Sequence, residues 1–209
     1  MTKSYNWKKG INTNELDEVI DIINSNGIII FPTETVYGIG GNALSENVIK
    51  HIYEVKNRPS QKPLSILLKS KKEIEKYAEI TSDIERKIIE KFMPGPITLI
   101  MKKKENVLSD LVTAGNSTIG IRIPNEKIIK QILERLNFPI VAPSANISGE
   151  PSVTKAEDIS KEFDGKIDAI IDGGICKEKI SSTIIQIIDN KPVILREGSI
   201  RLEDIMKKI

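Results

Sequence analysis

Short apolar runs that alternate with amphipathic helical segments are the feature that most restricts the fold of this chain. Ile28-Ile29-Ile30-Phe31 is a continuous apolar run of strand length, and residues 14–25 before it carry apolar side chains at helical spacing. A continuous apolar run is typical of a strand covered on both faces, whereas the spacing before it predicts a helix with one buried side. Together they predict a layered α/β structure.

The same alternation continues along the chain. Further helices are predicted over 45–55, 71–78, 82–92, 125–136, 154–163 and 199–208, and further strands over 64–68, 97–101, 117–124, 139–142, 168–171, 184–188 and 192–195. Ser82 with Glu85 and Thr154 with Glu157 have the spacing of capping boxes, and Ser199 is expected to cap the last helix. No internal repeat or interdomain linker is found, so residues 1–209 are interpreted as a single domain.

Composition limits the classes of partner. The chain has 209 residues, a net charge of +2 and 39% hydrophobic residues, which is ordinary for a globular protein with a substantial core. Aromatic residues make up only 4%, which argues against a stacking platform for single-stranded nucleic acid. The net charge is too small to indicate nucleic-acid binding by itself, although a local basic groove is compatible with it.

Cysteine and histidine are almost absent. Cys176 and His51 are the only residues of their types, which excludes an intrachain disulfide, a Cys/His zinc site and a Ser-His-Asp triad within one chain. No apolar run approaches the roughly 20 residues of a membrane span, and the first ten residues lack the apolar region of a signal peptide. We therefore expect a soluble, cytoplasmic protein that does not bind membranes.

A stiff basic segment lies between a predicted helix and a predicted strand, over residues 56–63. Lys56, Arg58 and Lys62 place three cations within seven positions, and Pro59 and Pro63 restrict the backbone around them. Arginine offers a planar fork of donors and lysine a mobile charge, a combination that suits a polyphosphate. A solvated basic turn without a ligand is the alternative interpretation.

Small polar side chains follow several of the predicted strands. Thr33, Thr35 and Tyr37 come after the strand that ends at Phe31, and residues 143–149 follow the strand over 139–142. Open α/β sheets commonly bind ligands at the ends of their strands. A binding site is one interpretation of the first group, and a glycine-rich turn without a ligand is the other.

Arg122 stands on an apolar strand, on the same face as Thr118. Burial of an unpaired guanidinium is costly, so Arg122 needs either an acidic partner in the protein or a carboxylate ligand. A structural ion pair is the commoner arrangement, but no acidic residue nearby in sequence is an obvious partner.

Several motifs, taken in order, resemble those of the YrdC/Sua5 family of threonylcarbamoyl-AMP synthases. They are Phe31-Pro32-Thr33-Glu34-Thr35-Val36-Tyr37-Gly38, Lys56-x-Arg58-Pro59, Pro94-Gly95-Pro96, Gly120-x-Arg122-x-Pro124, Ala142-Pro143-Ser144-Ala145-Asn146-x-Ser148-Gly149 and Leu195-Arg196-Glu197-Gly198. The resemblance extends from about residue 14 to residue 198. It implies an α/β fold with a twisted mixed sheet flanked by helices and a deep basic groove, in the short, single-domain form of the family.

The resemblance also implies an activity, namely conversion of L-threonine, bicarbonate and ATP to threonylcarbamoyl-AMP and diphosphate. This is the first step of the threonylcarbamoyladenosine modification of tRNA, and the product would pass to a downstream tRNA threonylcarbamoyl-transferase machinery. Magnesium would be carried by the ATP phosphates rather than by a protein site. Similarity assigns catalysis to Lys56 and Arg58; ATP binding to Lys56, Arg58, Ser60, Thr118, Ser144, Asn146, Ser152 and Arg196; and threonine binding to Thr33, Arg122, Ala142 and Ser182.

One departure from the family pattern and two alternative functions remain. Leu67 stands where long members of the family commonly have a histidine. The same basic groove would also suit a double-stranded RNA-binding module, and weak RNA binding is compatible with the synthase as well. A nucleotide-binding protein without catalysis is the third interpretation.

Overall fold

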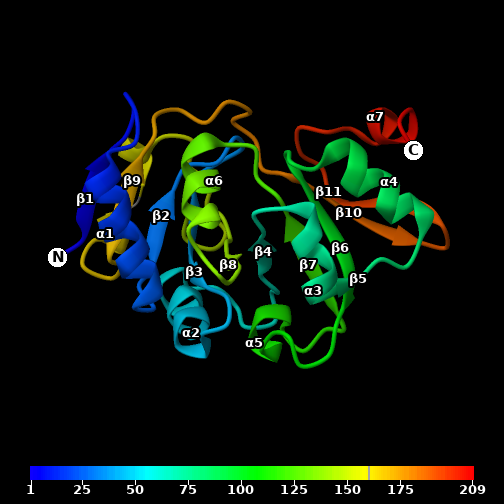
Figure 1. Cartoon of the computed structure of the whole chain (residues 1–209), viewed down its shortest axis with the longest axis horizontal. Helices are drawn as coiled ribbons and strands as arrows, with labels where there is room; N and C mark the ends of the chain where they lie inside the picture. Colours follow the sequence, from blue (N-terminus) through cyan, green and yellow to red (C-terminus); the bar gives the residue numbers. More distant parts are fainter. Residues whose placement is uncertain (160) are drawn as a thin grey trace.

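The structure, a computed structural model that describes residues 1–159 and 161–209, contains one mixed β-sheet (Figure 1). Its strands lie in the order β1-β9-β2-β3-β8-β4-β7-β6-β10-β11, and β5 pairs with β6 beside this path. The strand bounds are β1 Lys3–Asn6, β2 Ile29–Phe31, β3 Gly38–Asn42, β4 Ser65–Leu67, β5 Ala78–Glu79, β6 Ile97–Lys103, β7 Thr118–Arg122, β8 Ile140–Val141, β9 Ala169–Asp172, β10 Thr183–Ile188 and β11 Lys191–Arg196. The predicted α/β fold with a mixed sheet is confirmed, while the deep basic groove stays a prediction.

Helices alternate with these strands along the chain and pack against the sheet. Their bounds are α1 Thr13–Asn24, α2 Glu46–Val55, α3 Ile74–Tyr77, α4 Asp83–Phe92, α5 Asp110–Thr113, α6 Lys127–Glu134 and α7 Leu202–Met206, with short 3₁₀ turns η1 Lys71–Glu73, η2 Ala156–Asp158 and η3 Lys161–Phe163. The side chain of Asn12 accepts hydrogen bonds from the first turn of α1, and Glu126 does the same for α6. Side-chain caps therefore fix where these two helices begin.

Two apolar cores cover the faces of the sheet. In β2, Ile30 packs into the larger core, whereas Ile29 and Phe31 pack into the smaller one; this is the alternation expected of a strand buried on both faces. Figure 1 shows α1 and α6 side by side over the strands of the smaller core, and α2 belongs to the larger core. The sequence pattern of residues 28–31 thus reflects two covered faces.

The glycine-rich segment after β2 is a strand rather than a turn. β3 pairs antiparallel with β2, so that Ile30 faces Ile39, and β3 also pairs with β8. A side chain at Gly40 would collide with the carbonyl oxygen of Val141. Glycine is required there because two backbones approach closely, a reason for strand glycines that periodicity does not reveal.

Other differences from the sequence-based expectations lie at the ends of elements. The helix predicted over 154–163 is replaced by the 3₁₀ turns η2 and η3, and η2 begins after Lys155 without a side-chain cap; residue 160 of this prediction lies outside the described residues. Arg201, not Ser199, precedes α7.

Ser82 caps α4 as predicted, but the Glu85 carboxylate accepts from the N–H of Thr81. Strands β1 and β5 and helix α5 were not expected from the sequence.

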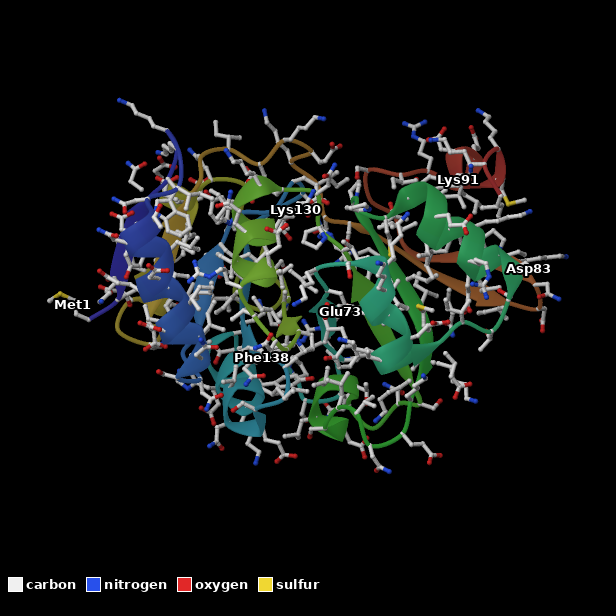
Figure 2. The ribbon with its side chains drawn as sticks, viewed as in Figure 1. Met1, Glu73, Asp83, Lys91, Lys130 and Phe138 are labelled. Atoms are coloured by element: carbon white, nitrogen blue, oxygen red, sulfur yellow. The ribbon has the colours of Figure 1, made fainter. Side chains whose placement is uncertain are left out.

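Charged side chains point to solvent from both ends of α4, where Figure 2 labels Asp83 and Lys91. In the part of the chain that the structure describes, no helix combines the length and the apolar character needed to cross a membrane.

The packing of α6 yields a stability prediction. Ile132 is fully buried in the smaller core, and its replacement by alanine removes buried methyl and methylene groups. We expect Ile132→Ala to lower the free energy of unfolding by about 2–4 kcal/mol, measured by urea denaturation. Exposed Glu134 lies on the same helix, and Glu134→Ala is the control, with an expected change within about 0.5 kcal/mol. Equal effects of the two substitutions would contradict this account of the core.

Candidate active site

A cavity of about 140 Å³ lies against one face of the sheet. Its walls come from the loops after β2 and β8, the faces of β4 and β7, and the adjoining ends of β10 and β11. The lining residues are Thr33, Val36, Tyr37, Gly38, Arg58, Pro63, Leu64, Ser65, Leu67, Thr98, Arg122, Ala142, Pro143, Ser144, Ser181, Ser182, Ile184 and Arg196. In β4, Ser65 and Leu67 line the cavity while Ile66 packs into the larger core, so strand alternation decides which side chains reach the cavity.

Three guanidinium groups line this cavity. Arg58, Arg122 and Arg196 come from the loop after α2, from β7 and from β11. No aspartate or glutamate is among the lining residues. Since arginine stays protonated at neutral pH, the wall carries concentrated positive charge. An anionic ligand with several oxygens would be bound well here.

The loop after α2 holds Arg58 in place. Its Nε donates to the carbonyl of Lys62 at 3.1 Å, and its Nη2 donates to the carbonyl of Pro63 at 2.8 Å. Burial lowers the pKa of Arg58. Carbonyl groups near the end of the predicted basic turn over 56–63 therefore bind Arg58 and hold its guanidinium at the cavity.

Arg196 is fixed by the backbone that enters β10. Its Nε and Nη2 donate to the carbonyl of Ser182 at 3.1 and 2.7 Å, and Nη2 also donates to the Ser182 hydroxyl at 3.0 Å. The Ser182 hydroxyl lies 2.8 Å from that of Thr98. A side chain at Gly198 would collide with the backbone of residues 181–183, so this close approach requires glycine. Partial loss of hydration, and then the charges of Arg122 and Arg58, lower the pKa of Arg196.

Arg122 has an acidic partner that sequence proximity did not suggest. Its Nη2 lies 2.9 Å from Oε2 of Glu34, and the two side chains are only 9% and 8% exposed. Glu34 follows β2 and is 88 positions away along the chain, so the partner comes from the fold. The expectation that Arg122 needs a protein acid or a carboxylate ligand is therefore met by a protein acid.

Thr33 organises the loop after β2. Its hydroxyl donates to the carbonyl of Val36 at 2.6 Å, accepts from the N–H of Val36 at 3.2 Å and lies 2.8 Å from the hydroxyl of Thr35. The Tyr37 hydroxyl instead donates to the carbonyl of Gly174 at 2.7 Å. The three hydroxyls singled out in the sequence thus support the loop, and Thr33 and Tyr37 also line the cavity.

Lys56 is buried behind the cavity wall. It is only 1% exposed, and its ammonium donates to the carbonyl of Ser144 at 2.6 Å and to the carbonyl of Asn146. The carbonyl of Lys56 accepts from the N–H of Ser148 at 2.8 Å. Burial, and secondarily the charge of Arg58, lower the pKa of Lys56 to about 7. Lys56 therefore holds the turn that carries Ser144 into the cavity.

Asn146 and Ser152 lie next to the cavity but are not among its lining residues. The Asn146 amide donates to the carbonyls of Ile147 and Glu150 at 2.9 and 2.8 Å, which closes the turn after β8. The Ser152 hydroxyl lies 3.2 Å from that of Ser181, which does line the cavity. Both side chains shape the wall from behind.

Two predicted ATP ligands lie elsewhere. Ser60 lines a separate, more open cavity of about 980 Å³ between the loop after α2, α5 and the segment before it. Thr118 begins β7, four residues before Arg122 and opposite Lys102, which places it roughly 13 Å along the strand from Arg122. The other predicted residues, namely Thr33, Arg58, Arg122, Ala142, Ser144, Ser182 and Arg196, meet in one cavity.

Sequence reasoning missed several residues of the wall. Ser65 and Leu67 share a face of β4, and alternation along residues 64–68 would have identified them. Thr98 supports Ser182 across two strands, a contact that only the parallel pairing of β6 with β10 creates. Glu34 belongs to the first of the family-like motifs, but the sequence pattern does not indicate a role for it.

The buried amine of Lys56 makes stability depend on pH. Its pKa is about 7 in the folded protein and near 10.4 in an unfolded chain, so the unfolded state binds more protons between these values. Stability should therefore rise with pH in this interval. Between pH 7 and pH 9 we expect the free energy of unfolding of the wild type to rise by about 2 kcal/mol relative to that of Lys56→Met. Urea unfolding of both proteins at each pH measures this difference. A difference that does not change with pH would contradict the lowered pKa.

Comparison with known proteins adds independent information. The family model for Sua5, YciO and YrdC proteins, described as telomere recombination, matches residues 21–198. A threonylcarbamoyl-AMP synthase of Pyrococcus abyssi (strain GE5 / Orsay) is 40% identical over 209 residues, which are 100% of this chain and 61% of the relative. A putative threonylcarbamoyl-AMP synthase of Methanocaldococcus jannaschii is 43% identical over 201 residues, and the match covers 94% of each chain.

Solved structures agree with the sequence matches. The structure of P. abyssi Sua5 complexed with L-threonine is 39% identical and superimposes with a TM-score of 0.94, covering 100% of this chain and 61% of that one. Escherichia coli YciO, at 22% identity and a TM-score of 0.88, shares the fold. The chain spans about three fifths of the length of the P. abyssi synthase and 56% of a Bacillus subtilis one. With a family model matched over most of its length, this chain belongs to the Sua5/YciO/YrdC family.

Proposed function

We propose that the chain is a threonylcarbamoyl-AMP synthase, which converts L-threonine, bicarbonate and ATP to threonylcarbamoyl-AMP and diphosphate. The observation that carries the proposal is the convergence of Arg58, Arg122 and Arg196 on one small cavity without acidic wall residues. Threonine, bicarbonate and ATP are all anionic or carry carboxylates, so this charge suits every substrate. Relatives named threonylcarbamoyl-AMP synthase support the proposal.

Threonine would bind beside Arg122. A guanidinium presents paired donors that match a carboxylate, and Arg122 lines the cavity together with Thr33, Ala142 and Ser182. Ser182 supplies a hydroxyl group for the polar atoms of threonine, Thr33 shapes the loop on that side of the cavity, and Ala142 leaves room for the methyl group of threonine. The structure of P. abyssi Sua5 complexed with L-threonine supports threonine as the amino acid that this family of sites binds.

ATP would bind on the side of Arg58 and Arg196. Both guanidinium groups face the cavity without an acidic partner on its wall, and Ser144 adds a hydroxyl. Lys56 and Asn146 contribute from behind by fixing the turn that carries Ser144. Ser152 extends this wall through Ser181. For Ser60 and Thr118, contact with ATP would require a nucleotide that reaches beyond the cavity.

The reaction needs positioning and positive charge more than a protein nucleophile. The amine of threonine combines with carbon dioxide or bicarbonate to form a carbamate, with loss of a proton or of water. A carbamate oxygen then forms a bond to the α-phosphorus while the bond from that phosphorus to the bridging oxygen breaks, and diphosphate leaves. Negative charge gathers around phosphorus in the transition state, where Arg58 and Arg196 would stabilise it.

Magnesium would enter with ATP rather than bind to the protein first. The cavity wall has no carboxylate, and the described residues contain no group of three or more His, Cys, Asp or Glu side chains that could hold a metal ion. Magnesium commonly stays on substrate phosphates and neutralises part of their charge. The product would then pass to a tRNA threonylcarbamoyl-transferase, which completes the modification.

Pyrophosphate release tests the proposal directly. The purified protein is incubated with ATP and magnesium, with threonine and bicarbonate each present or withheld. We expect release only when both are present, because the carbamate that attacks ATP is made from them. Pyrophosphate release that does not depend on threonine would refute the proposed synthase activity. The absence of pyrophosphate release from a folded protein that binds ATP would refute it as well.

Substitutions should distinguish the threonine side of the cavity, at Arg122, from the ATP side, at Arg58. We expect Arg58→Ala to lower kcat/KM about 10²-fold because it removes a charge next to the reacting phosphate. We expect Arg122→Ala to raise the KM for threonine about tenfold or more, with the KM for ATP nearly unchanged. Both constants come from initial rates of pyrophosphate release. Arg135→Ala is the control, since Arg135 is half-exposed, pairs with Asp17 and does not line the cavity. Identical kinetic defects in all three variants would argue against these assignments.

A further inference from the structure

The Glu34–Arg122 pair extends the site beyond the residues that face the cavity. Arg122 lines the cavity, whereas Glu34 lines a second cavity of about 250 Å³ on the other side of the loop after β2. The guanidinium therefore has the cavity on one side and the Glu34 carboxylate on the other, 2.9 Å from its Nη2.

The contact between Arg122 and Glu34 is an ion pair without a well-aligned hydrogen bond. Within residues 1–159 and 161–209, Nε and Nη2 of Arg122 and both carboxylate oxygens of Glu34 are buried and have no hydrogen-bond partner of suitable geometry. The attraction between the two side chains is therefore Coulombic. Arg122 also lines the cavity, where its guanidinium can meet the carboxylate of a ligand.

The backbone also fixes where the Glu34 carboxylate lies. The carbonyl of Glu34 accepts from the N–H of Glu178 at 2.8 Å, and the neighbouring Thr33 hydroxyl closes the same loop onto Val36. Glu34 is buried. Its charge is thus held at a fixed place behind Arg122.

The other cavity arginines explain why such a charge is needed. Arg58 and Arg196 line the same cavity, and like charges held close together repel one another. A guanidinium without a counter-ion would turn away from them. Glu34 offsets the charge of Arg122 from behind, where it does not occupy the cavity.

We propose that Glu34 is a positioning residue for threonine, which holds the Arg122 guanidinium in the orientation that binds the substrate carboxylate. This inference rests on the proposed function and adds a residue to it. Glu34 touches no substrate and acts only through Arg122. Its loss should therefore affect threonine and spare ATP.

The test compares Glu34→Gln with a matched control. Glu34→Gln keeps the size of the side chain and removes its charge; we expect the KM for threonine to rise about tenfold, with the KM for ATP changed less than twofold. Glu126→Gln removes a half-buried carboxylate that lines the same second cavity and caps α6 but does not pair with Arg122. The control should keep the wild-type KM for threonine.

A second substitution separates positioning from a structural role. In an Arg122→Ala background, Glu34→Gln should cause no further rise in the KM for threonine, because Glu34 acts only through Arg122. An unchanged KM in the single Glu34→Gln variant, or equal rises for threonine and ATP with a lowered Tm, would overturn the inference. Wild-type protein that releases no pyrophosphate with threonine would overturn the proposed function as well, so the two failures are distinguishable.

Discussion

The concentration of like charge in the middle of the sheet is the constraint on which the site depends. Three guanidinium groups line a cavity of only about 140 Å³, and each must be held against the repulsion of the others. The protein uses backbone carbonyls for Arg58 and Arg196 and a carboxylate for Arg122. All these partners lie in the wall or behind it. The open side of each guanidinium is therefore left to an anion.

Lys56, which lies behind the cavity wall, is also held by backbone carbonyls. Its ammonium is buried against two carbonyls of the turn after β8, so a charge that costs free energy to bury is used to hold a loop. The geometry gives Lys56 a positional role in the proposed site, whereas Arg58, two residues later, reaches the cavity. Adjacent basic residues of one segment thus serve different purposes. Composition alone would treat them as equivalent.

Sequence patterns predicted the layers of the fold better than its turns. Residues 14–25 and 28–31 became α1 and β2 because helical spacing and a continuous apolar run each leave few alternatives. The sequence did not predict strand β3, because its glycines reflect the close approach of another strand. At Gly40 a side chain would collide with the carbonyl of Val141. Most candidate site residues came from ordered motifs and meet in one cavity. Glu34 lacked a predicted role because its partner, Arg122, becomes a neighbour only when β2 and β7 enter the same sheet.

The location of the cavity follows from strand alternation, and it suits the proposed chemistry. Ligands of open α/β sheets usually lie beyond the strand ends, and Thr33 and Ser144 do come from loops after β2 and β8. Ser65, Leu67 and Arg122, however, face the cavity from within β4 and β7, where Leu67 pairs with Arg122. A site on a face of the sheet is bordered by packed side chains, and the Arg122 side chain there is only 9% exposed. Fixed guanidinium groups act more strongly on a developing phosphate charge in such a place than they would in open solvent.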